Sequence, residues 1–161
     1  MLTELTITRR DMIALGTIAV CGCACGSLAI AAEDDKKPKR PEKLVIGKLA
    51  DYADVKFYDA FAKQKLMVRR LPDRLIAMSA TCTHKGCTVR IDKTDADALR
   101  CPCHKGMFSE QGTPTDGPPK FSLVRFAISA DASGEITIDT TRSFEERQWD
   151  DPAAFIALPA K

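Results

Sequence analysis

The pattern of apolar and polar positions divides the chain into two unlike parts. Residues 12–32 form one uncharged run, whereas beyond residue 43 the apolar residues fall in short runs that are rich in β-forming side chains. These runs are 44–49, 55–58, 65–69, 75–79, 88–91, 121–128 and 136–138. Several alternate with the period of two that is typical of strands, and no long helical period occurs after residue 32. We therefore predict an all-β, antiparallel domain that an apolar helix precedes.

The run 121–128 shows the clearest alternation. Its residues divide into two faces, with Val124, Phe126 and Ile128 on one and Arg125 and Ala127 on the other. A strand with this pattern is expected to be half-buried. Residues 71–73 and Ser133-Gly134 predict turns, the second of them a hairpin, and residues 59–65 are compatible with one helical turn.

Four regions follow from these patterns. Residues 1–32 are an export signal or membrane anchor, 33–42 a charged linker with two prolines, 43–142 the β domain, and 143–161 a C-terminal tail. The linker is expected to be exposed and partly stiffened by its prolines. The apolar residues of the tail could pack on the domain or contact a partner subunit, and the sequence does not choose between these two arrangements.

The N-terminal segment has the features of an export signal. Arg9-Arg10 precede the moderately apolar run, which is typical of a twin-arginine signal. A plain secretory signal or a simple anchor with two arginines is the alternative. The run is long enough to cross a bilayer, which needs about 20 residues, and Ala29-Ile30-Ala31 offers a cleavage site. We expect an exported protein on the periplasmic side of the membrane, attached through its N-terminus if this segment is not cleaved.

Composition excludes several classes of function. The net charge is +2, with 29% charged and 45% hydrophobic residues, which is typical of a globular protein. No run of lysine and arginine is interleaved with aromatic residues, and only 6% of the residues are aromatic. A nucleic-acid partner is therefore not expected.

Candidate chemistry is concentrated in two short stretches, CTHKGC at 82–87 and CPCHKGMF at 101–108. They hold both histidines and four of the seven cysteines. Cys82-x-His84 and Cys101-x-x-His104 together offer two thiolates and two imidazoles. Zinc accepts such a set, and so does a [2Fe–2S] cluster in which two histidines replace two cysteines. One intervening residue is tight for two ligands of a single tetrahedral ion, which favours the cluster, with zinc as the alternative.

The two stretches resemble the two motifs of the Rieske iron–sulfur family, in the disulfide-bearing form of cytochrome bc and b6f complexes. The resemblance spans about residues 43 to 142 and includes Gly117-Pro118-Pro119, which in the family begins a loop over the cluster. It implies a small antiparallel domain with a cluster-binding subdomain of two loops. The implied roles are Cys82 and Cys101 on one iron, His84 and His104 on the other, with both histidines exposed at the tip, and a disulfide between Cys87 and Cys103.

The function that the resemblance implies is one-electron transfer in a membrane-associated quinol:cytochrome c-type oxidoreductase. The chain would be an electron-transfer subunit rather than a stand-alone enzyme. Its partners would be quinol-oxidising or other redox subunits and a c-type cytochrome. One alternative is the small Rieske subunit of another exported, arsenite-oxidase-like oxidoreductase. Another is a ferredoxin-type component of an oxygenase, but Cys87 and Cys103 argue against it, because cytosolic thiols stay reduced.

Two departures from the quinol-oxidising pattern change this picture. Those relatives usually continue Gly-Ser-x-Tyr after the second histidine, whereas here the residues are Lys105-Gly106-Met107-Phe108. The missing hydroxyl groups would donate hydrogen bonds to sulfur atoms, so we expect a lower reduction potential than in the usual relatives. Lys85 also stands where leucine is usual. Lys85 and Lys105 are either a solvated rim or a docking patch for an acidic partner.

Overall fold

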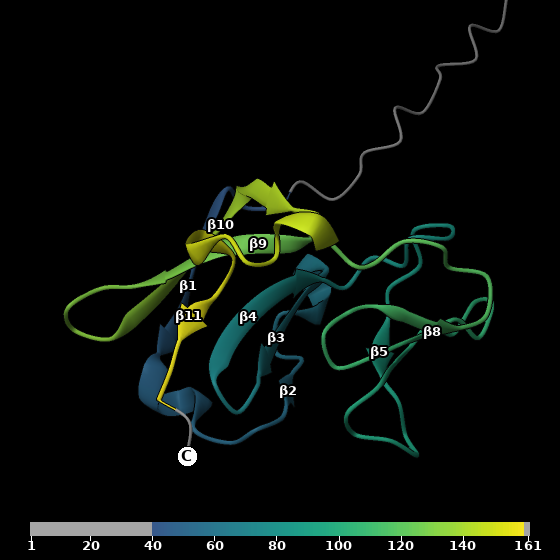
Figure 1. The fold of residues 1–161 in the computed structure, drawn as a ribbon, viewed down its shortest axis with the longest axis horizontal. Coiled ribbons are helices and arrows are strands. Elements are labelled where there is room, and N and C mark those ends of the chain that lie inside the picture. Colours follow the sequence, from purple (N-terminus) through teal and green to yellow (C-terminus); the bar gives the residue numbers. More distant parts are fainter. Residues whose placement is uncertain (1–39, 160–161) are drawn as a thin grey trace, which may run out of the picture. The chain divides into compact units, whose positions relative to one another are not determined.

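The computed structural model describes residues 40–159, which form antiparallel β-sheets (Figure 1). The chain divides into two units, Met1–Asp35 and Lys36–Lys161. The first unit, with the expected signal or anchor helix, and most of the linker lie outside the described residues. Within residues 40–159 no helix has the length and apolar character that crossing a membrane requires.

A large sheet of seven strands carries a smaller sheet of four at one end (Figure 1). The order in the large sheet is β1 (Lys43–Lys48), β10 (Glu135–Phe144), β9 (Arg125–Ala130), β4 (Arg74–Ser79), β3 (Leu66–Arg70) and β2 (Phe57–Tyr58), with β11 (Ile156–Ala157) also paired to β4. The small sheet has the order β5 (Arg90–Ile91), β6 (Leu99–Arg100), β7 (Met107–Phe108) and β8 (Pro114–Asp116). Short 3-10 turns are η1 (Leu49–Tyr52), η2 (Ala62–Gln64), η3 (Glu146–Gln148) and η4 (Pro152–Ala154).

Each of the seven runs predicted as strands overlaps a strand of the structure. The predicted hairpin is also present, since the Gly134 N–H donates to the Asp131 carbonyl at 3.0 Å between β9 and β10. The strands β6, β7, β8 and β11 were not predicted. They have only two or three residues, which is too few for an alternation to be recognised.

Strand β4 lies between two hydrophobic cores because its alternate side chains point to opposite faces. Leu75 and Ala77 belong to one core, and Ile76 and Met78 belong to the other. The second, which we call the site core, consists of Phe57, Met67, Leu71, Ile76, Met78, Ala80, Cys82, Val89, Leu99, Cys101, Phe108 and Leu123. It joins the large sheet to the small one, and each large apolar side chain buried there stabilises the fold by about 1.5 to 3 kcal/mol.

The prediction of a half-buried strand at 121–128 is wrong for β9, which is buried on both faces. Arg125 is 1% exposed and Ala127 is 7% exposed. The end of β10 and the residues after it cover this face, where Ala127 packs with Phe144, Trp149 and Ala154. The Arg125 guanidinium lies 3.9 Å from the centre of the Trp149 ring. The tail therefore packs on the domain, and β11 adds to the large sheet beside β4.

The last linker residues also contact the domain. Arg40 donates hydrogen bonds to the carbonyls of Gln64, at 3.0 Å, and Lys65, at 2.9 Å. Its guanidinium lies 4.5 Å from the centre of the Phe126 ring. The described part of the linker is thus fixed to the large sheet immediately before β1 begins.

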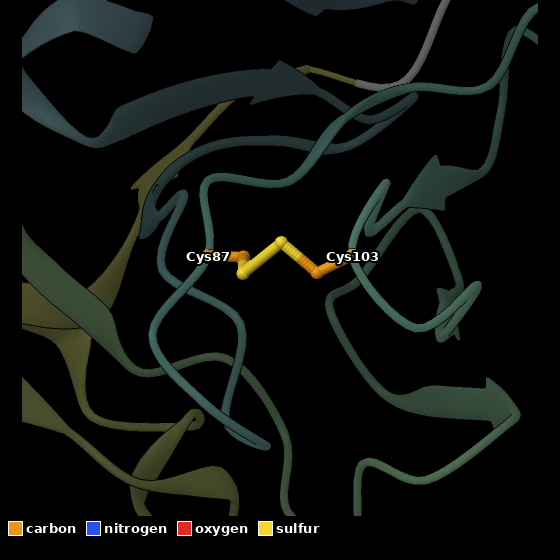
Figure 2. The surroundings of a disulfide bond; sticks show 2 residues. All are labelled: Cys87 and Cys103. Carbon is orange, nitrogen blue, oxygen red and sulfur yellow. A yellow bond between two sulfur atoms is a disulfide. The ribbon is translucent and has the colours of Figure 1, made fainter.

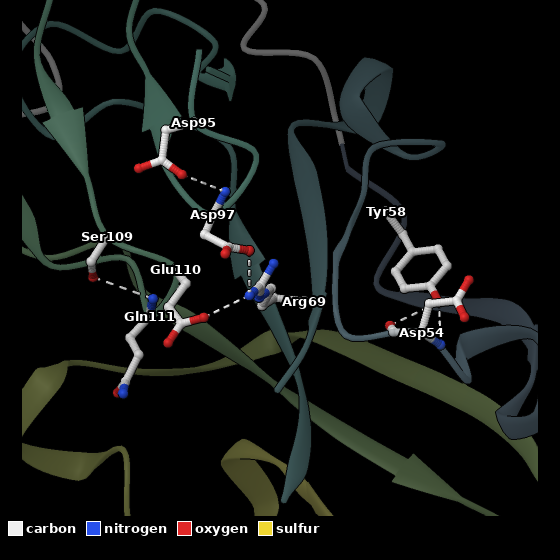
Figure 3. Close-up of polar contacts among 8 residues, drawn as sticks. All are labelled: Asp54, Tyr58, Arg69, Asp95, Asp97, Ser109, Glu110 and Gln111. Atoms are coloured by element: carbon white, nitrogen blue, oxygen red, sulfur yellow. Dashed lines mark hydrogen bonds and ion pairs between the residues drawn. The ribbon is translucent and has the colours of Figure 1, made fainter. Parts of the chain in front are cut away.

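A single buried arginine of the large sheet holds two connections of the small sheet. Arg69 Nη2 donates to Asp97 Oδ1 at 2.9 Å and to Glu110 Oε2 at 2.6 Å, and its side chain is 1% exposed (Figure 3). Asp97 lies between β5 and β6, and Glu110 lies between β7 and β8. The arginine also stacks on Phe57, 4.7 Å from the ring centre. Because a buried charge needs partners, this arginine ties the position of the small sheet to that of β3.

Candidate metal centre

Two loops with the same backbone turn form the candidate site. In loop 82–87 the Cys82 N–H donates to the Cys87 carbonyl at 2.8 Å, and in loop 101–106 the Cys101 N–H donates to the Gly106 carbonyl at 2.8 Å. In both loops the fourth residue after the first cysteine has a positive φ, 73° at Gly86 and 56° at Lys105. The loops therefore turn alike although their sequences differ.

The glycine and the lysine at that fourth position differ in the conformational free energy that a positive φ costs them. Glycine adopts a positive φ without steric penalty, which suits Gly86. A lysine in the same region costs about 1 to 2 kcal/mol. Lys105 is one of only two residues other than glycine with a positive φ in the described part of the chain. Its conformation is imposed by the loop, since the hydrogen bond from Cys101 to Gly106 encloses it.

The structure brings the four predicted ligands together in two pairs. Cys82 and Cys101 are free, buried thiols whose side chains interact with each other. The rings of His84 and His104 meet edge to face, with their centres 4.7 Å apart. The prediction that both histidines are exposed is correct for His104 and wrong for His84, which is partly buried because its Nδ1 faces the interior. The thiols thus lie inside the site core, and the imidazoles lie nearer to solvent.

The disulfide that the resemblance implied is present between Cys87 and Cys103, with the Cα atoms 6.5 Å apart (Figure 2). It joins the end of one loop to the middle of the other. The Cys101 Sγ lies within 4.8 Å of both disulfide sulfur atoms. These three sulfur atoms do not form a second metal site, because a disulfide offers no thiolate.

A third segment, residues 117–121, closes against both loops. A Cβ placed on Gly106 would lie 2.6 Å from Pro119 Cγ, and one on Gly117 would lie 2.9 Å from Gly106 Cα. Glycine at both positions therefore allows the segment to pack directly on loop 101–106. On the other side, the Thr83 hydroxyl donates to the Phe121 carbonyl at 2.7 Å.

The two positions that lack hydroxyl groups are both closely packed. Phe108 is fully buried in the site core with Cys82 and Cys101. At Gly106 the Pro119 ring fills the space that a serine side chain would need. A serine at position 106 would therefore require residues 117–121 to move away.

The protonation of the site follows from its burial. Burial raises the pKa of the Cys82 thiol, and the backbone N–H groups of His84 and Lys85 oppose this by lowering it. Burial lowers the pKa of His84, and the neighbouring His104 and Lys85 lower it further. Without metal, the site therefore favours a neutral thiol and a neutral imidazole.

The residues fit a cluster whose ligands are thiolates and imidazoles. Nδ1 of His84 is buried and has no hydrogen-bond partner among the described residues. A buried polar atom without a partner is costly unless a ligand satisfies it. Two buried thiols, this nitrogen and the adjacent His104 imidazole form the four-donor set that a [2Fe–2S] centre of the mixed cysteine and histidine type requires.

Comparison with known proteins identifies the family of the domain. Residues 43–127 match the Rieske [2Fe-2S] domain, and the chain belongs to this family. Its domain thus belongs to a class that binds a [2Fe–2S] cluster.

Two curated relatives carry names of redox-complex subunits. The chain is 32% identical to the cytochrome b6-f complex iron-sulfur subunit of Chlorobaculum tepidum, over 64% of this chain and 56% of the relative. It is 42% identical to the menaquinol:cytochrome c reductase iron-sulfur subunit of Geobacillus thermodenitrificans, over 32% of each chain. The chain thus spans about half the length of these relatives, or less. The solved plasma membrane Rieske protein of Synechocystis PCC 6803 is 22% identical, over 59% of this chain and 97% of that one, with a TM-score of 0.41.

Sequence reasoning missed the contacts that hold the two loops in place. Within the run LMVRR, no sequence pattern distinguishes Arg69 as a residue that contacts the small sheet. Its position relative to Met67 was the available signal, because residues two apart in a strand share a face and Met67 is in the site core. The contact of Pro119 with Gly106 had no such signal, because it joins two separate loops.

Proposed function

We propose that the chain carries one electron through a [2Fe–2S] cluster held by Cys82, His84, Cys101 and His104. We further propose that it acts as a subunit of a membrane-associated quinol:cytochrome c-type oxidoreductase, facing the periplasm. The observation that supports the ligand set is the buried thiol pair next to a histidine pair with an unpartnered Nδ1. Similarity to the iron-sulfur subunits of such complexes supports the type of complex.

The thiols and the imidazoles would have different roles because they lie at different depths in the protein. The two thiols are in the hydrophobic interior and would exclude water from the sulfur side of the site. The two imidazoles lie toward solvent, and with Nδ1 of His84 directed inward, Nε2 remains to hold a proton. The bound group supplies one-electron chemistry between about −150 and +300 mV. A histidine that can gain or lose a proton near physiological pH suits the oxidation of a quinol, which releases electrons and protons together.

The surrounding residues would keep this arrangement rigid. The disulfide joins the two ligand loops, and residues 117–121 contact both. Arg69 fixes the small sheet, which carries loop 101–106, to the large one. Because ligand loops that cannot separate retain a bound group, these contacts support a permanent cofactor rather than a transient metal.

Spectroscopy of the purified full chain tests the ligand set. The reduced protein is expected to give the electron paramagnetic resonance signal of a [2Fe–2S] centre with mixed ligands. Cys82→Ser and His104→Asn should each abolish this signal, whereas the control Cys25→Ser, outside the set, should leave it unchanged. A colourless protein that contains zinc would refute the proposal.

Isolation of the complex tests the proposed partners. A tagged full chain, extracted from membranes in mild detergent, should co-purify with a b-type cytochrome and become reduced when a quinol is added. Recovery with an oxygenase, or with an oxidoreductase that quinol does not reduce, would contradict this assignment.

A further inference from the structure

One lysine projects from each of the three segments that form the tip of the site. Lys85 lies in loop 82–87, Lys105 in loop 101–106 and Lys120 in segment 117–121, and all three are exposed. These three segments contain no aspartate or glutamate. The tip therefore carries three positive charges that its own segments do not neutralise.

Contacts between the segments hold the three lysines around the histidine pair. Lys85 and Lys105 each follow directly after one of the two histidines, whose ring centres are 4.7 Å apart. Lys120 lies between Pro119, which packs on Gly106, and Phe121, whose carbonyl accepts from Thr83. The charges thus belong to one surface rather than to three unrelated loops.

The three lysines have no ion-pair partner among the described residues, and one of them, Lys120, adjoins an exposed aromatic ring. None of the three forms an ion pair with another residue between 40 and 159. Phe121 is 73% exposed, compared with 53% for Val45 and 48% for Val55, the other exposed large hydrophobic residues between 40 and 159. Asp116, which directly precedes segment 117–121, is exposed. Glu145 and Glu146 line a pocket together with Lys120 and Phe121, and Glu146 accepts a hydrogen bond from the Ser122 hydroxyl at 2.6 Å.

This combination favours one kind of partner. Burying free lysines in an apolar pocket is costly, because a charge without a partner loses its hydration. A partner with carboxylates next to an apolar patch would pair with the lysines and cover Phe121 beside Lys120. Complementary charges would also raise the association rate.

We propose that this tip docks an acidic, soluble electron-carrier protein whose carboxylates surround its exposed redox group. In the complex the reduced protein loses one electron and the carrier gains one, and a proton held by a histidine leaves to water rather than to the carrier. This inference rests on the proposed function, and it deepens that function by naming the chemistry of a partner at the same site.

The test uses the cluster-containing full chain with an acidic plastocyanin and a basic cytochrome c as probes. Binding is followed by chemical-shift changes in the oxidised proteins, and electron transfer by stopped-flow absorbance. We expect the plastocyanin affinity and rate to fall at least tenfold between about 10 and 200 mM salt. The basic cytochrome should bind more weakly at low salt.

Lysine variants locate the effect. Lys85→Gln, Lys105→Gln and Lys120→Gln should each weaken plastocyanin binding by about 1.5- to 5-fold, the effect of one exposed ion pair. The triple variant should lose most of the salt dependence. Lys48→Gln, on β1 at the far end of the large sheet, is the matched control and should change nothing (Figure 1).

Three results would overturn the inference. The first is equal binding of both probes, and the second is unchanged binding in the triple variant. The third is lysine-dependent binding to anionic phospholipid vesicles without binding to plastocyanin, which would assign the tip to a membrane surface. These results leave the cluster signal intact, so they are distinct from failure of the proposed function, in which that signal is missing.

Discussion

The two ligand loops share a backbone turn but are held in place by different forces. Loop 82–87 has glycine at its left-handed position and is joined to residues 117–121 by a hydrogen bond from Thr83. Loop 101–106 has a lysine there and is joined to the same segment by close packing of Gly106 on Pro119. One turn can therefore be maintained by conformational preference or by steric contact, and the loops should respond differently to the same substitution.

The loops differ also in where they place the disulfide cysteine. Cys87 ends the first loop, whereas Cys103 lies in the middle of the second, immediately before His104. The bond therefore crosses the site asymmetrically and brings both its sulfur atoms close to Cys101. Loop 101–106 should depend on the disulfide more than loop 82–87 does.

Removal of the disulfide should have the largest effect of the substitutions that test this difference. The Cys87→Ala/Cys103→Ala variant should lose about 3 kcal/mol of stability, the value for a loop closed over 16 residues. Urea unfolding measures this loss, and the decay of visible absorbance measures retention of the cluster. If hydrogen exchange rises equally in both loops, the second loop is not the more dependent one.

Alanine substitutions at the two loop glycines compare the cost of a steric overlap with the cost of a strained backbone φ. Gly106→Ala should cost about 2 to 3 kcal/mol because its Cβ overlaps Pro119. Gly86→Ala meets no atom within 4 Å and should cost only the strain of its positive φ, about 1 kcal/mol. Thermal unfolding with the linked variant Pro119→Ala distinguishes the causes. That variant should rescue Gly106→Ala and not Gly86→Ala, and equal rescue would contradict the comparison.

A hydroxyl group added next to loop 101–106 should raise the reduction potential. Phe108 is fully buried beside both free cysteines, and Phe108→Tyr supplies the donor that this loop lacks. A hydrogen bond worth about 1 kcal/mol to the reduced form corresponds to about +40 mV. Redox titration monitored by paramagnetic resonance measures the shift. Phe108→Leu, which adds no donor, is the control, and an equal shift there would exclude the hydrogen bond as the cause.

Asp92, in the segment that connects the two ligand loops, should have the smallest effect, a loss of stability at acid pH. Hydrogen bonds from the Thr94 side chain and backbone and from the Asp95 backbone hold the pKa of Asp92 at about 2, and Arg100 contributes. The folded-state pKa is below the ordinary value of about 3.9. The stabilisation is therefore complete above that value and is lost as the pH falls toward 2. Unfolding between pH 5 and about 2 should show this loss in the wild type and not in Asp92→Asn.

The sequence predicted the strands and the site better than it predicted how they are fixed in space. Alternation located β1 and β4, and cysteine spacing located the two loops, since both signals are local. The buried second face of β9 could not be predicted, because Arg125 is polar by type and is covered by Trp149 from a distant part of the chain. The contact of Pro119 with Gly106 likewise depends on the finished fold.

Because the two free cysteines lie within the site core, their burial limits when a cofactor can be inserted. Cys82 and Cys101 pack with Met78 and Phe108, so iron and sulfide must arrive before that core closes or wait for it to reopen. The disulfide then joins the two ligand loops. We therefore expect the cofactor to be inserted first and Cys87 and Cys103 to be oxidised afterwards. Such an order needs reducing conditions followed by oxidising ones.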